Sequence, residues 1–378
     1  MKTLELFGRG SISKLNKSLT KLRGSRVLLI TGKNSYEKSP KRLEVESNLD
    51  GFLVQRYCDV DLNPDIENLI NGVRFANQFN PDIIVGLGGG SVLDTAKLIS
   101  ILPANESEIR DIIIGIKRVP ARIKHLILAP TTSGSGSEAT QFAVSYVGKK
   151  KYSVSSLEML PDMVFLDSEF TDTMPKELTA TTAFDAISQA IESFWAVGAT
   201  RQSMNYASTS ISAILEIFYT LLTNPTSECR DQMMISSNLA GKAINISKTT
   251  GPHAISYALT KYFRIPHGIA VILTLAAFFE FNTNMINSIP NKPIEIAEYE
   301  QRIARLYQIM RAENSAEVII KINKMIKQAG LKPGLKNFGL INPEDLILLT
   351  ESVNIERLNN NPLSIDKSQL MTILKKSW

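Results

Sequence analysis

Short apolar runs alternate with a helical pattern along the first half of the chain. The runs cover residues 26–31 (RVLLIT), 51–57 (GFLVQRY), 82–87 (DIIVGL) and 125–129 (HLILA). Between the second and the third run, residues 64–77 repeat apolar positions at helical spacing and begin with a proline suited to a first turn. This alternation predicts a parallel sheet with helices on its faces, and such sheets bind ligands at the carboxyl ends of their strands.

The pattern changes after residue 177. Helical repeats then follow one another over 178–196, 203–222, 228–247, 253–263, 268–281, 295–312, 315–329 and 343–353. No strand pattern stands among them, and residues 282–293 and 359–366 show no regular pattern. We therefore predict an α/β domain over residues 1–177 and an all-helical domain over residues 178–378.

Composition narrows the class of protein. The 378 residues are 44% apolar and 21% charged, and no run of about 18 apolar residues could span a membrane. The N-terminus lacks an apolar signal-peptide run, and only Cys58 and Cys229 are present, which fits a reducing cytoplasm. The net charge of +5 is scattered apart from Lys149-Lys150-Lys151, so we expect no nucleic-acid or membrane partner. A small anionic substrate would fit this charge.

Two loops rich in small residues follow predicted strands. In PDIIVGLGGGSVLDTAK (81–97), Gly88, Gly89, Gly90 and Ser91 lie between a strand and a helix, where backbone N–H groups can approach a phosphate. A tight strand-to-helix turn would give the same pattern. APTTSGSGSEAT (129–140) follows the next strand, and two such loops at one edge favour a large phosphorylated cofactor.

The end of the first strand bears on which nicotinamide cofactor is used. Gly32 stands where an acidic residue often holds the ribose of NADH. With Lys33 beside it, this position leaves room for the 2′-phosphate of NADPH, and both cofactors stay open.

The helix pattern TTAFDAISQAIESFW (181–195) carries an unusual polar pair. Asp185 and Gln189 are one turn apart and lie with Glu192 opposite an apolar stripe. A solvated polar face would give the same pattern. His253 and His267 change the picture, because an acid, two histidines and a neutral oxygen ligand can hold a divalent metal. The third histidine, His125, lies in a strand pattern and is interpreted as structural.

These segments resemble the iron-type (group III) alcohol dehydrogenases. The resemblance rests on GGGSVLDTAK, PTTSGSGSEAT, FDAISQAIESFW and PHG at 266–268, in that order, and runs from about residue 5 to about residue 280. It implies a dehydroquinate synthase-like architecture, with a dinucleotide-binding α/β domain, an all-helical domain and NADPH or NADH in the cleft between them. It also implies a divalent iron or zinc ion that polarises the substrate carbonyl, and a homodimer.

The resemblance carries over residue by residue. Residues 88–91 would cradle the pyrophosphate. The other implied cofactor residues are Asp94, Thr131, Thr132, Ser135 and Lys151. The implied metal ligands are Asp185, Gln189, His253 and His267, where Gln189 replaces a histidine of the family. Tyr257 replaces another active-site histidine and is a candidate proton relay, although a structural tyrosine would look the same.

A narrower resemblance concerns the substrate. QAIESFW, AGKAINISKTTGPHAISY and IPHGIAVILTL look more like the phosphonoacetaldehyde reductase branch than like simple alcohol dehydrogenases. Lys242 and Lys248 would suit a phosphonate dianion, or they are ordinary surface lysines. The implied reaction is NAD(P)H-dependent reduction of phosphonoacetaldehyde to 2-hydroxyethylphosphonate.

Three alternatives to this reaction stay open. One is a broad-specificity alcohol, aldehyde or diol dehydrogenase of the same family. The second is a lyase of the dehydroquinate synthase type, which shares the architecture. The third is an inactive nucleotide-binding homologue, suggested by Gln189 and Tyr257.

Overall fold

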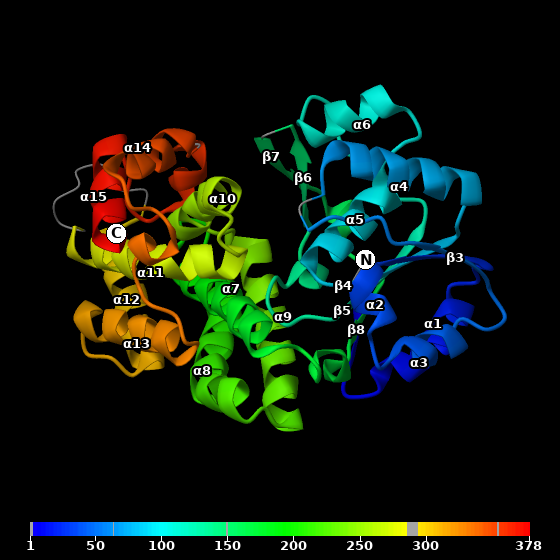
Figure 1. Cartoon of the computed structure of the whole chain (residues 1–378), viewed down its shortest axis with the longest axis horizontal. Coiled ribbons are helices and arrows are strands. Elements are labelled where there is room, and N and C mark those ends of the chain that lie inside the picture. Colours follow the sequence, from blue (N-terminus) through cyan, green and yellow to red (C-terminus); the bar gives the residue numbers. More distant parts are fainter. Residues whose placement is uncertain (1–2, 63, 149, 286–293, 354) are drawn as a thin grey trace. The chain divides into compact units, whose positions relative to one another are not determined.

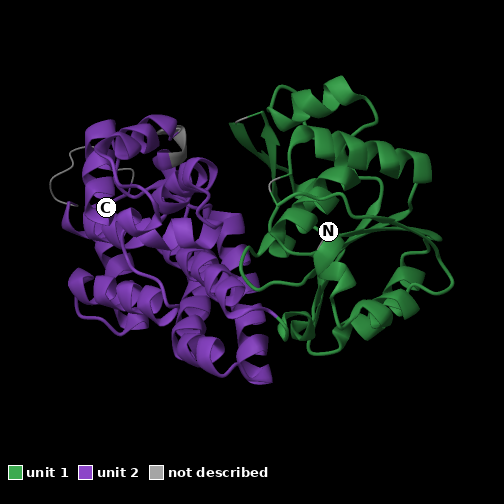
Figure 2. Cartoon of the chain, in the orientation of Figure 1, with its two compact units in different colours: residues 1–173 green, residues 174–378 purple. Residues whose placement is uncertain are grey.

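The chain divides into two compact units, residues 1–173 and 174–378 (Figure 2). The computed structural model describes residues 3–62, 64–148, 150–285, 294–353 and 355–378. Lys149 of the basic run and most of the loop expected at 282–293 lie outside the described residues. Each unit has its own hydrophobic core, so each is described by itself.

A six-stranded parallel sheet forms the centre of the first unit (Figure 1). In spatial order its strands are β1 (Leu4–Phe7), β8 (Met163–Leu166), β5 (His125–Pro130), β4 (Ile83–Gly88), β2 (Arg26–Thr31) and β3 (Leu53–Tyr57). The four strands predicted from apolar runs are confirmed as β2 to β5. The sequence pattern missed β1 and β8, because each is only four residues long.

Both faces of this sheet are covered by helices. Leu28 and Ile30 point to one face, under α4 (Ile66–Phe79), α5 (Gly90–Ile101) and α6 (Glu106–Ile113). Val27 and Leu29 point to the other, under η1 (Ser11–Lys14), α1 (Leu15–Lys21), α2 (Lys33–Glu37) and α3 (Arg42–Ser47). This two-sided burial explains why the strands appear as continuous apolar runs without polar alternation.

An antiparallel hairpin, which the sequence analysis missed, also belongs to this unit. It pairs β6 (Phe142–Val147) with β7 (Lys150–Ser155). Its strands mix polar and apolar residues and only part of each is buried, so no apolar run marks them. The short turns η2 (Ser137–Ala139) and η3 (Leu157–Met159) flank the hairpin in sequence.

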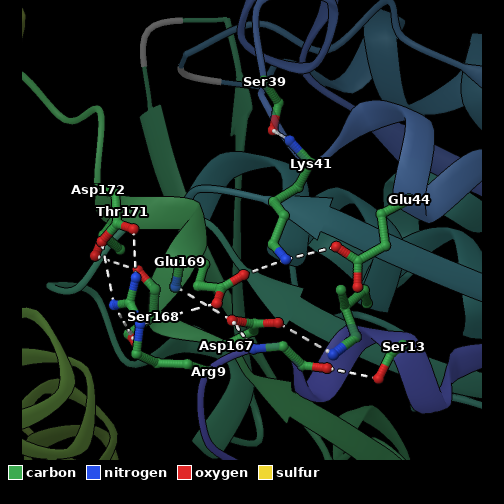
Figure 3. A network of polar contacts seen from close by, with 12 residues as sticks. Arg9, Ser13, Ser39, Lys41, Glu44, Asp167, Ser168, Glu169, Thr171 and Asp172 are labelled. Atoms are coloured by element: carbon green, nitrogen blue, oxygen red, sulfur yellow. Dashed lines mark hydrogen bonds and ion pairs between the residues drawn. The ribbon is translucent and has the colours of Figure 1, made fainter. Parts of the chain in front are cut away.

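A polar network fastens the end of the sheet where β1 and β8 finish (Figure 3). Asp167 is fully buried and accepts hydrogen bonds from the backbone N–H groups of Gly10 (3.0 Å) and Ile12 (3.1 Å). Arg9 pairs with Asp172 at 2.5 Å, just beyond η4 (Ser168–Thr171). These bonds hold the last segment of the first unit on the loop that follows β1.

The second unit is helical throughout its described residues. It comprises α7 (Lys176–Trp195), α8 (Arg201–Thr223), α9 (Ser227–Ser247), α10 (Gly251–Phe263), α11 (His267–Asn284), α12 (Ile296–Met310), α13 (Ser315–Gln328), η5 (Leu335–Phe338), α14 (Pro343–Ser352), η6 (Ile355–Asn360) and α15 (Lys367–Ser377). The predicted order of a parallel-sheet domain followed by a helical domain is confirmed. No helical repeat in the sequence predicted α15, which begins with a capping box at Asp366 and Gln369.

Helix α7 is buried on all sides along its second half. Every residue from 183 to 195 is buried, and Asp185, Gln189 and Glu192 are only 7%, 4% and 0% exposed. The interpretation of these residues as a solvated face is therefore wrong. Helices α8, α9 and α11 pack against α7 and cover the polar face as well as the apolar stripe.

Two further expectations can be compared with the described residues. No helix among them is long and apolar enough to cross a membrane. Cys58 and Cys229 both carry free thiols, as expected from their separation in the sequence.

Candidate active site

Three side chains of metal-ligand type meet inside the helical unit. Asp185 lies on α7, His253 lies in the first turn of α10, and His267 is the first residue of α11. Their ligand atoms all lie within 4.8 Å of one another. The Oδ1 atom of Asp185 is 3.2 Å from Nε2 of His253 and 3.8 Å from Nε2 of His267. Two histidine nitrogens therefore converge on one carboxylate oxygen.

Close helix contacts at two glycines make this convergence possible. A Cβ atom on Gly268 would lie 1.9 Å from the carbonyl oxygen of Thr181, so α11 can start against α7 only with glycine at this position. A Cβ atom on Gly251 would lie 2.0 Å from the ring of Phe278, so glycine also lets α10 begin against α11. The glycine of the PHG motif thus sets the distance between His267 and α7.

Gln189 lies beside this group but points its amide nitrogen at it. The Nε2 atom of Gln189 donates to Oδ1 of Asp185 at 3.1 Å. In this arrangement the amide is a hydrogen-bonding neighbour of Asp185. The alternative role, a metal ligand through Oε1, would need the amide to turn over. The predicted ligand role of Gln189 stays a proposal.

A buried carboxylate holds the outer nitrogen of His253. Glu192 Oε1 pairs with Nδ1 of His253, while Oε2 accepts from the backbone N–H (2.6 Å) and the hydroxyl (2.9 Å) of Thr250. Trp195 Nε1 donates to the same hydroxyl at 2.8 Å. We call Asp185, Gln189, Glu192, His253 and His267 the Asp185 cluster.

In this cluster, neighbouring charges together affect the pKa values of His253 and Asp185 more than burial does. Burial alone would lower the pKa of His253, but the carboxylates of Glu192 and Asp185 outweigh it and raise that pKa to about 9. Burial would raise the pKa of Asp185, but the facing His267 and His253 hold it below its usual value. The cluster thus favours positive charge facing Asp185, which is what a divalent ion supplies.

Tyr257 and His125, the other two ring residues considered in the sequence analysis, lie in different units. Tyr257 lies one turn after His253 and stacks on His267, with ring centroids 6.0 Å apart and planes at 4°. His125 begins β5 in the other unit, where its Nδ1 atom is 3.4 Å from Asp162. His125 therefore makes a local contact in the α/β unit, as its strand pattern suggested.

The two small-residue loops meet in the α/β unit. Gly88 ends β4, and its carbonyl accepts from the backbone N–H of Thr131, which follows β5, at 2.9 Å. A Cβ atom on Gly90 would lie 2.9 Å from the hydroxyl of Ser135, so the second loop packs directly on the start of α5. The two loops therefore form one surface at the carboxyl ends of adjacent strands.

The other predicted cofactor residues are placed as follows. Thr132 lies within 3.5 Å of the position a Cβ atom would take on Gly89. Ser91 donates its hydroxyl to the carbonyl of Leu62 at 2.5 Å. Gly32 follows β2, the neighbour of β4, and so lies at the same edge of the sheet.

Asp94 and Lys97 form a second buried polar group beneath these loops. Asp94 accepts from the hydroxyl of Ser137 (2.5 Å) and the N–H of Val144 (3.0 Å). Lys97 is 0% exposed, and its ammonium donates to Ser137 (2.9 Å), Thr140 (3.1 Å) and the carbonyl of Phe142 (2.8 Å). We call Asp94, Lys97, Ser137 and Thr140 the Lys97 cluster. It fixes the second loop and β6 to α5.

Burial is the main cause of the pKa shifts of Lys97 and Asp94. It lowers the pKa of Lys97 to about 8 and raises the pKa of Asp94. Lys151, half-buried on β7, has a charge that acts on Asp94 in the opposite direction. Asp94, for which a place beside the cofactor stays a prediction, holds the second loop in place.

The two lysines of the predicted substrate site differ in exposure. Lys242 is half-buried within α9. Lys248 caps the end of α9 and is exposed, with φ 61° and ψ 177°. It lies five residues before His253.

Comparison with known proteins agrees with this architecture over the whole chain. Residues 4–168 match the family model for "Iron-containing alcohol dehydrogenase", and residues 179–378 match that for "Fe-containing alcohol dehydrogenase family, C-terminal". The chain belongs to the iron-containing alcohol dehydrogenase family.

Several members of this family are similar to the chain over nearly its full length. The sulfoacetaldehyde reductase of Bilophila wadsworthia is 30% identical, with 98% of this chain and 96% of that protein covered. The NADPH-dependent butanol dehydrogenase of Clostridium saccharobutylicum is 28% identical, with 98% and 95% covered. The sulfoacetaldehyde reductase of Bifidobacterium kashiwanohense in complex with NAD+ is 26% identical, with a TM-score of 0.88 and 99% and 96% covered.

Family membership establishes the class of enzyme. The chain is an alcohol dehydrogenase or aldehyde reductase of the iron-containing family, which works with a nicotinamide cofactor and a divalent metal. This confirms the predicted family, the predicted enzyme class and the predicted cofactors.

The Asp185 cluster fits such a metal. Ligand atoms that each lie about 2.0–2.2 Å from one tetrahedral ion are roughly 3.3–3.6 Å apart. The 3.2 Å and 3.8 Å separations around Asp185 Oδ1 bracket this range. One carboxylate and two imidazoles are donors suited to iron or zinc. Asp185, His253 and His267 would hold the ion, with Gln189 as their neighbour.

Sequence reasoning missed the part that Glu192 plays. It noted Glu192 only as a third polar residue on the face of Asp185 and Gln189. The available signal was the spacing, since positions i, i+4 and i+7 of a helix share one face. Its contacts with His253 and Thr250 join residues about 60 positions apart, which no local pattern reveals.

Proposed function

We propose that this enzyme reduces a two-carbon aldehyde that carries an oxyanion head group, with phosphonoacetaldehyde as substrate and 2-hydroxyethylphosphonate as product. The observation that carries the proposal is Lys248, an exposed cation five residues before the candidate ligand His253. No hydrogen bond or ion pair to another described residue occupies its ammonium group. An anionic head group would supply the missing partner through charge-assisted hydrogen bonds.

The backbone of Lys248 supports a functional reason for this residue. Its φ of 61° with ψ of 177° is a conformation that glycine adopts readily and that costs other residues roughly 1–3 kcal/mol. Asn360 secures both sides, donating from Nδ2 to the carbonyls of Ser247 (2.8 Å) and Thr249 (2.9 Å). Backbone strain of this kind is found mostly at functional sites, which supports a role for Lys248 in binding.

The named activities of the relatives point to the same class of substrate. Two of the relatives above are sulfoacetaldehyde reductases, and sulfoacetaldehyde is a two-carbon aldehyde with a sulfonate group. A sulfonate and a phosphonate share tetrahedral oxygens and negative charge. The butanol dehydrogenase among the relatives represents the alternative, a broad-specificity enzyme for neutral substrates.

The proposed roles of the residues follow from their places. The loops at Gly88–Gly90 and Thr131–Ser135 would bind the nicotinamide cofactor that donates hydride. Asp185, His253 and His267 would hold a divalent metal, which would supply Lewis-acid polarisation of the aldehyde carbonyl. Tyr257, stacked on His267, would provide the proton for the alcohol oxygen. The homodimer implied by the family also stays a proposal.

A substrate panel tests the proposal. Initial rates with NADPH and NADH would be compared for phosphonoacetaldehyde, sulfoacetaldehyde, butyraldehyde and lactaldehyde. We expect kcat/KM for the two anionic aldehydes to exceed that for butyraldehyde by roughly 10- to 100-fold, the value of a charge-assisted contact. The ratio of phosphonate to sulfonate then identifies the preferred head group. Equal kcat/KM values for anionic and neutral aldehydes would contradict the proposal.

Variants of Lys248 assign the preference to this residue. We expect Lys248→Ala to raise KM for phosphonoacetaldehyde roughly 10-fold or more, with little change for butyraldehyde. Lys248→Gly should do the same and raise the free energy of unfolding by up to about 1 kcal/mol, because it relieves the backbone. Arg311→Gly is the matched control, since Arg311 is also exposed, basic and at positive φ (52°) after a helix. Equal effects of Lys248→Ala on both substrates would exclude the anion-binding role.

A further inference from the structure

Glu192 is a fully buried carboxylate whose oxygens are all engaged. It is 0% exposed, and its partners are the Nδ1 atom of His253 and the N–H and hydroxyl groups of Thr250. A buried carboxylate is costly unless it is paired, and an apolar residue of similar volume is often as stable. Its presence beside a candidate metal ligand therefore needs a reason beyond packing.

The contact with His253 determines which nitrogen of that ring can bind a ligand. A carboxylate accepts hydrogen bonds, so the nitrogen that faces Glu192 must carry a proton. With the proton on Nδ1, the lone pair lies on Nε2, the atom 3.2 Å from Asp185 Oδ1. Carboxylates in this position orient metal-binding histidines and raise their basicity in many metalloproteins.

The second contact of Glu192 fixes where α10 begins. Oε2 holds both the backbone N–H and the side chain of Thr250, the residue directly before α10. Trp195 donates to the same hydroxyl and prevents it from rotating away. One carboxylate thus sets the ring orientation of His253 and the position of the helix that carries it.

We infer that Glu192 is the positioning residue of the metal centre, acting through His253 and Thr250. Its importance is greater in this chain because Gln189 leaves only two imidazoles among the candidate ligands. A correct tautomer and orientation at His253 then contribute a larger share of the metal affinity. This inference concerns metal binding alone and holds whichever aldehyde is reduced.

An amide at position 192 cannot reproduce these contacts. If the amide oxygen of Glu192→Gln faces His253, its NH2 group meets the N–H of Thr250, donor against donor. If its NH2 group faces His253, the ring must accept at Nδ1, and its proton moves to Nε2. Either arrangement weakens binding at Nε2, although the side chain keeps its volume.

The test measures zinc affinity by competition with a chromophoric chelator. We expect Glu192→Gln to weaken zinc binding roughly 10- to 100-fold and Thr250→Val to weaken it by a smaller factor. Asp167→Asn is the matched control, because it also converts a fully buried carboxylate to an amide, but in the other unit. Its zinc affinity should equal that of the unaltered protein. Circular dichroism confirms that each variant is folded.

Nitrogen NMR of the unaltered zinc-loaded protein gives an independent readout. The chain has three histidines, so a 15N-histidine spectrum can be assigned from single substitutions. We expect His253 to be protonated at Nδ1 and metal-bound at Nε2. Zinc affinity unchanged in folded Glu192→Gln would overturn the inference, as would a His253 ring without a proton on Nδ1. The second outcome does not depend on whether a Glu192 variant folds.

Discussion

The two buried polar clusters of this enzyme use burial in opposite ways. In the Lys97 cluster, three donor bonds from the ammonium end on Ser137, Thr140 and a carbonyl, which uses all the donors that a lysine has. In the Asp185 cluster, two histidine nitrogens converge on one carboxylate oxygen. The first cluster uses all its donors internally and fastens the second small-residue loop, whereas the ligand atoms of the second cluster converge on one point.

The pKa values of the clusters follow this difference. Burial lowers the pKa of Lys97, because the charges of Asp94, 3.9 Å away, and Glu138 do not compensate for lost hydration. Burial would also lower the pKa of His253, but Glu192 and Asp185, which are both hydrogen-bonded to its ring, reverse the direction. Burial of polar groups therefore does not itself indicate a metal site. Convergence of ligand atoms together with excess negative charge does.

The largest expected effect concerns Tyr257, the proposed proton donor that stacks on His267 of the Asp185 cluster. Tyr257→Phe keeps the ring that stacks on His267 but removes the hydroxyl proton. We expect kcat to fall roughly 100-fold, the contribution of a positioned proton donor, while zinc affinity stays unchanged. The pH dependence of kcat should also lose one limb. A kcat within about threefold of the unaltered enzyme would show that Tyr257 serves only in packing.

The next prediction concerns the effect of Gln189 on the zinc affinity of the Asp185 cluster. Gln189→His introduces the imidazole that the family resemblance implies at this position, and nitrogen is a better donor than an amide oxygen for zinc or iron. We expect zinc to bind roughly tenfold more tightly, equal to about 1.4 kcal/mol. The chelator competition described above measures it, with Gln189→Ala as the control that adds no ligand. Weaker binding in Gln189→His would mean that the amide's bond to Asp185 matters more than a further ligand.

The last prediction concerns stability and tests the Lys97 cluster through the pH dependence of the free energy of unfolding. The pKa of Lys97 falls from 10.5 to about 8 on folding, so between these values the unfolded chain binds more protons. The free energy of unfolding should therefore rise with pH in that window, by at most about 1.4 kcal/mol per pH unit. Lys97→Met removes this contribution, so the difference between the two proteins should grow from pH 8 to pH 10.5.

Urea unfolding at several pH values measures that difference. Lys21→Met, at an exposed position, is the control and should follow the unaltered protein. A constant difference between Lys97→Met and the unaltered protein would contradict the assigned shift in pKa.

The sequence predicted those parts of the fold that have a local signal. The strands β2 to β5 are apolar runs because both faces of the sheet are covered, and eight helices of the second unit follow from their periodicity. The strands β1 and β8 are too short for such a signal. The hairpin β6–β7 has only one partly buried face, and α15 follows a stretch without a pattern.

The candidate site was predictable through its motifs and not through its environment. The glycine loops and the polar residues of α7 stand out in the sequence. The solvated-face interpretation was wrong because burial of Asp185 depends on α9 and α11, which lie far along the chain. Glu192 was missed for the same reason, since its partners Thr250 and His253 are brought to it only by tertiary packing.

The central claim is that the Asp185 cluster holds a divalent ion that the reaction requires. The most direct test is metal analysis of the protein before and after dialysis against a chelator, with the rate of aldehyde reduction measured on the same samples. We expect one ion per chain, loss of the rate as the ion is removed, and recovery on adding Fe²⁺ or Zn²⁺. Asp185→Asn should bind no ion under the same conditions. An undiminished rate after complete removal of the metal would contradict the claim.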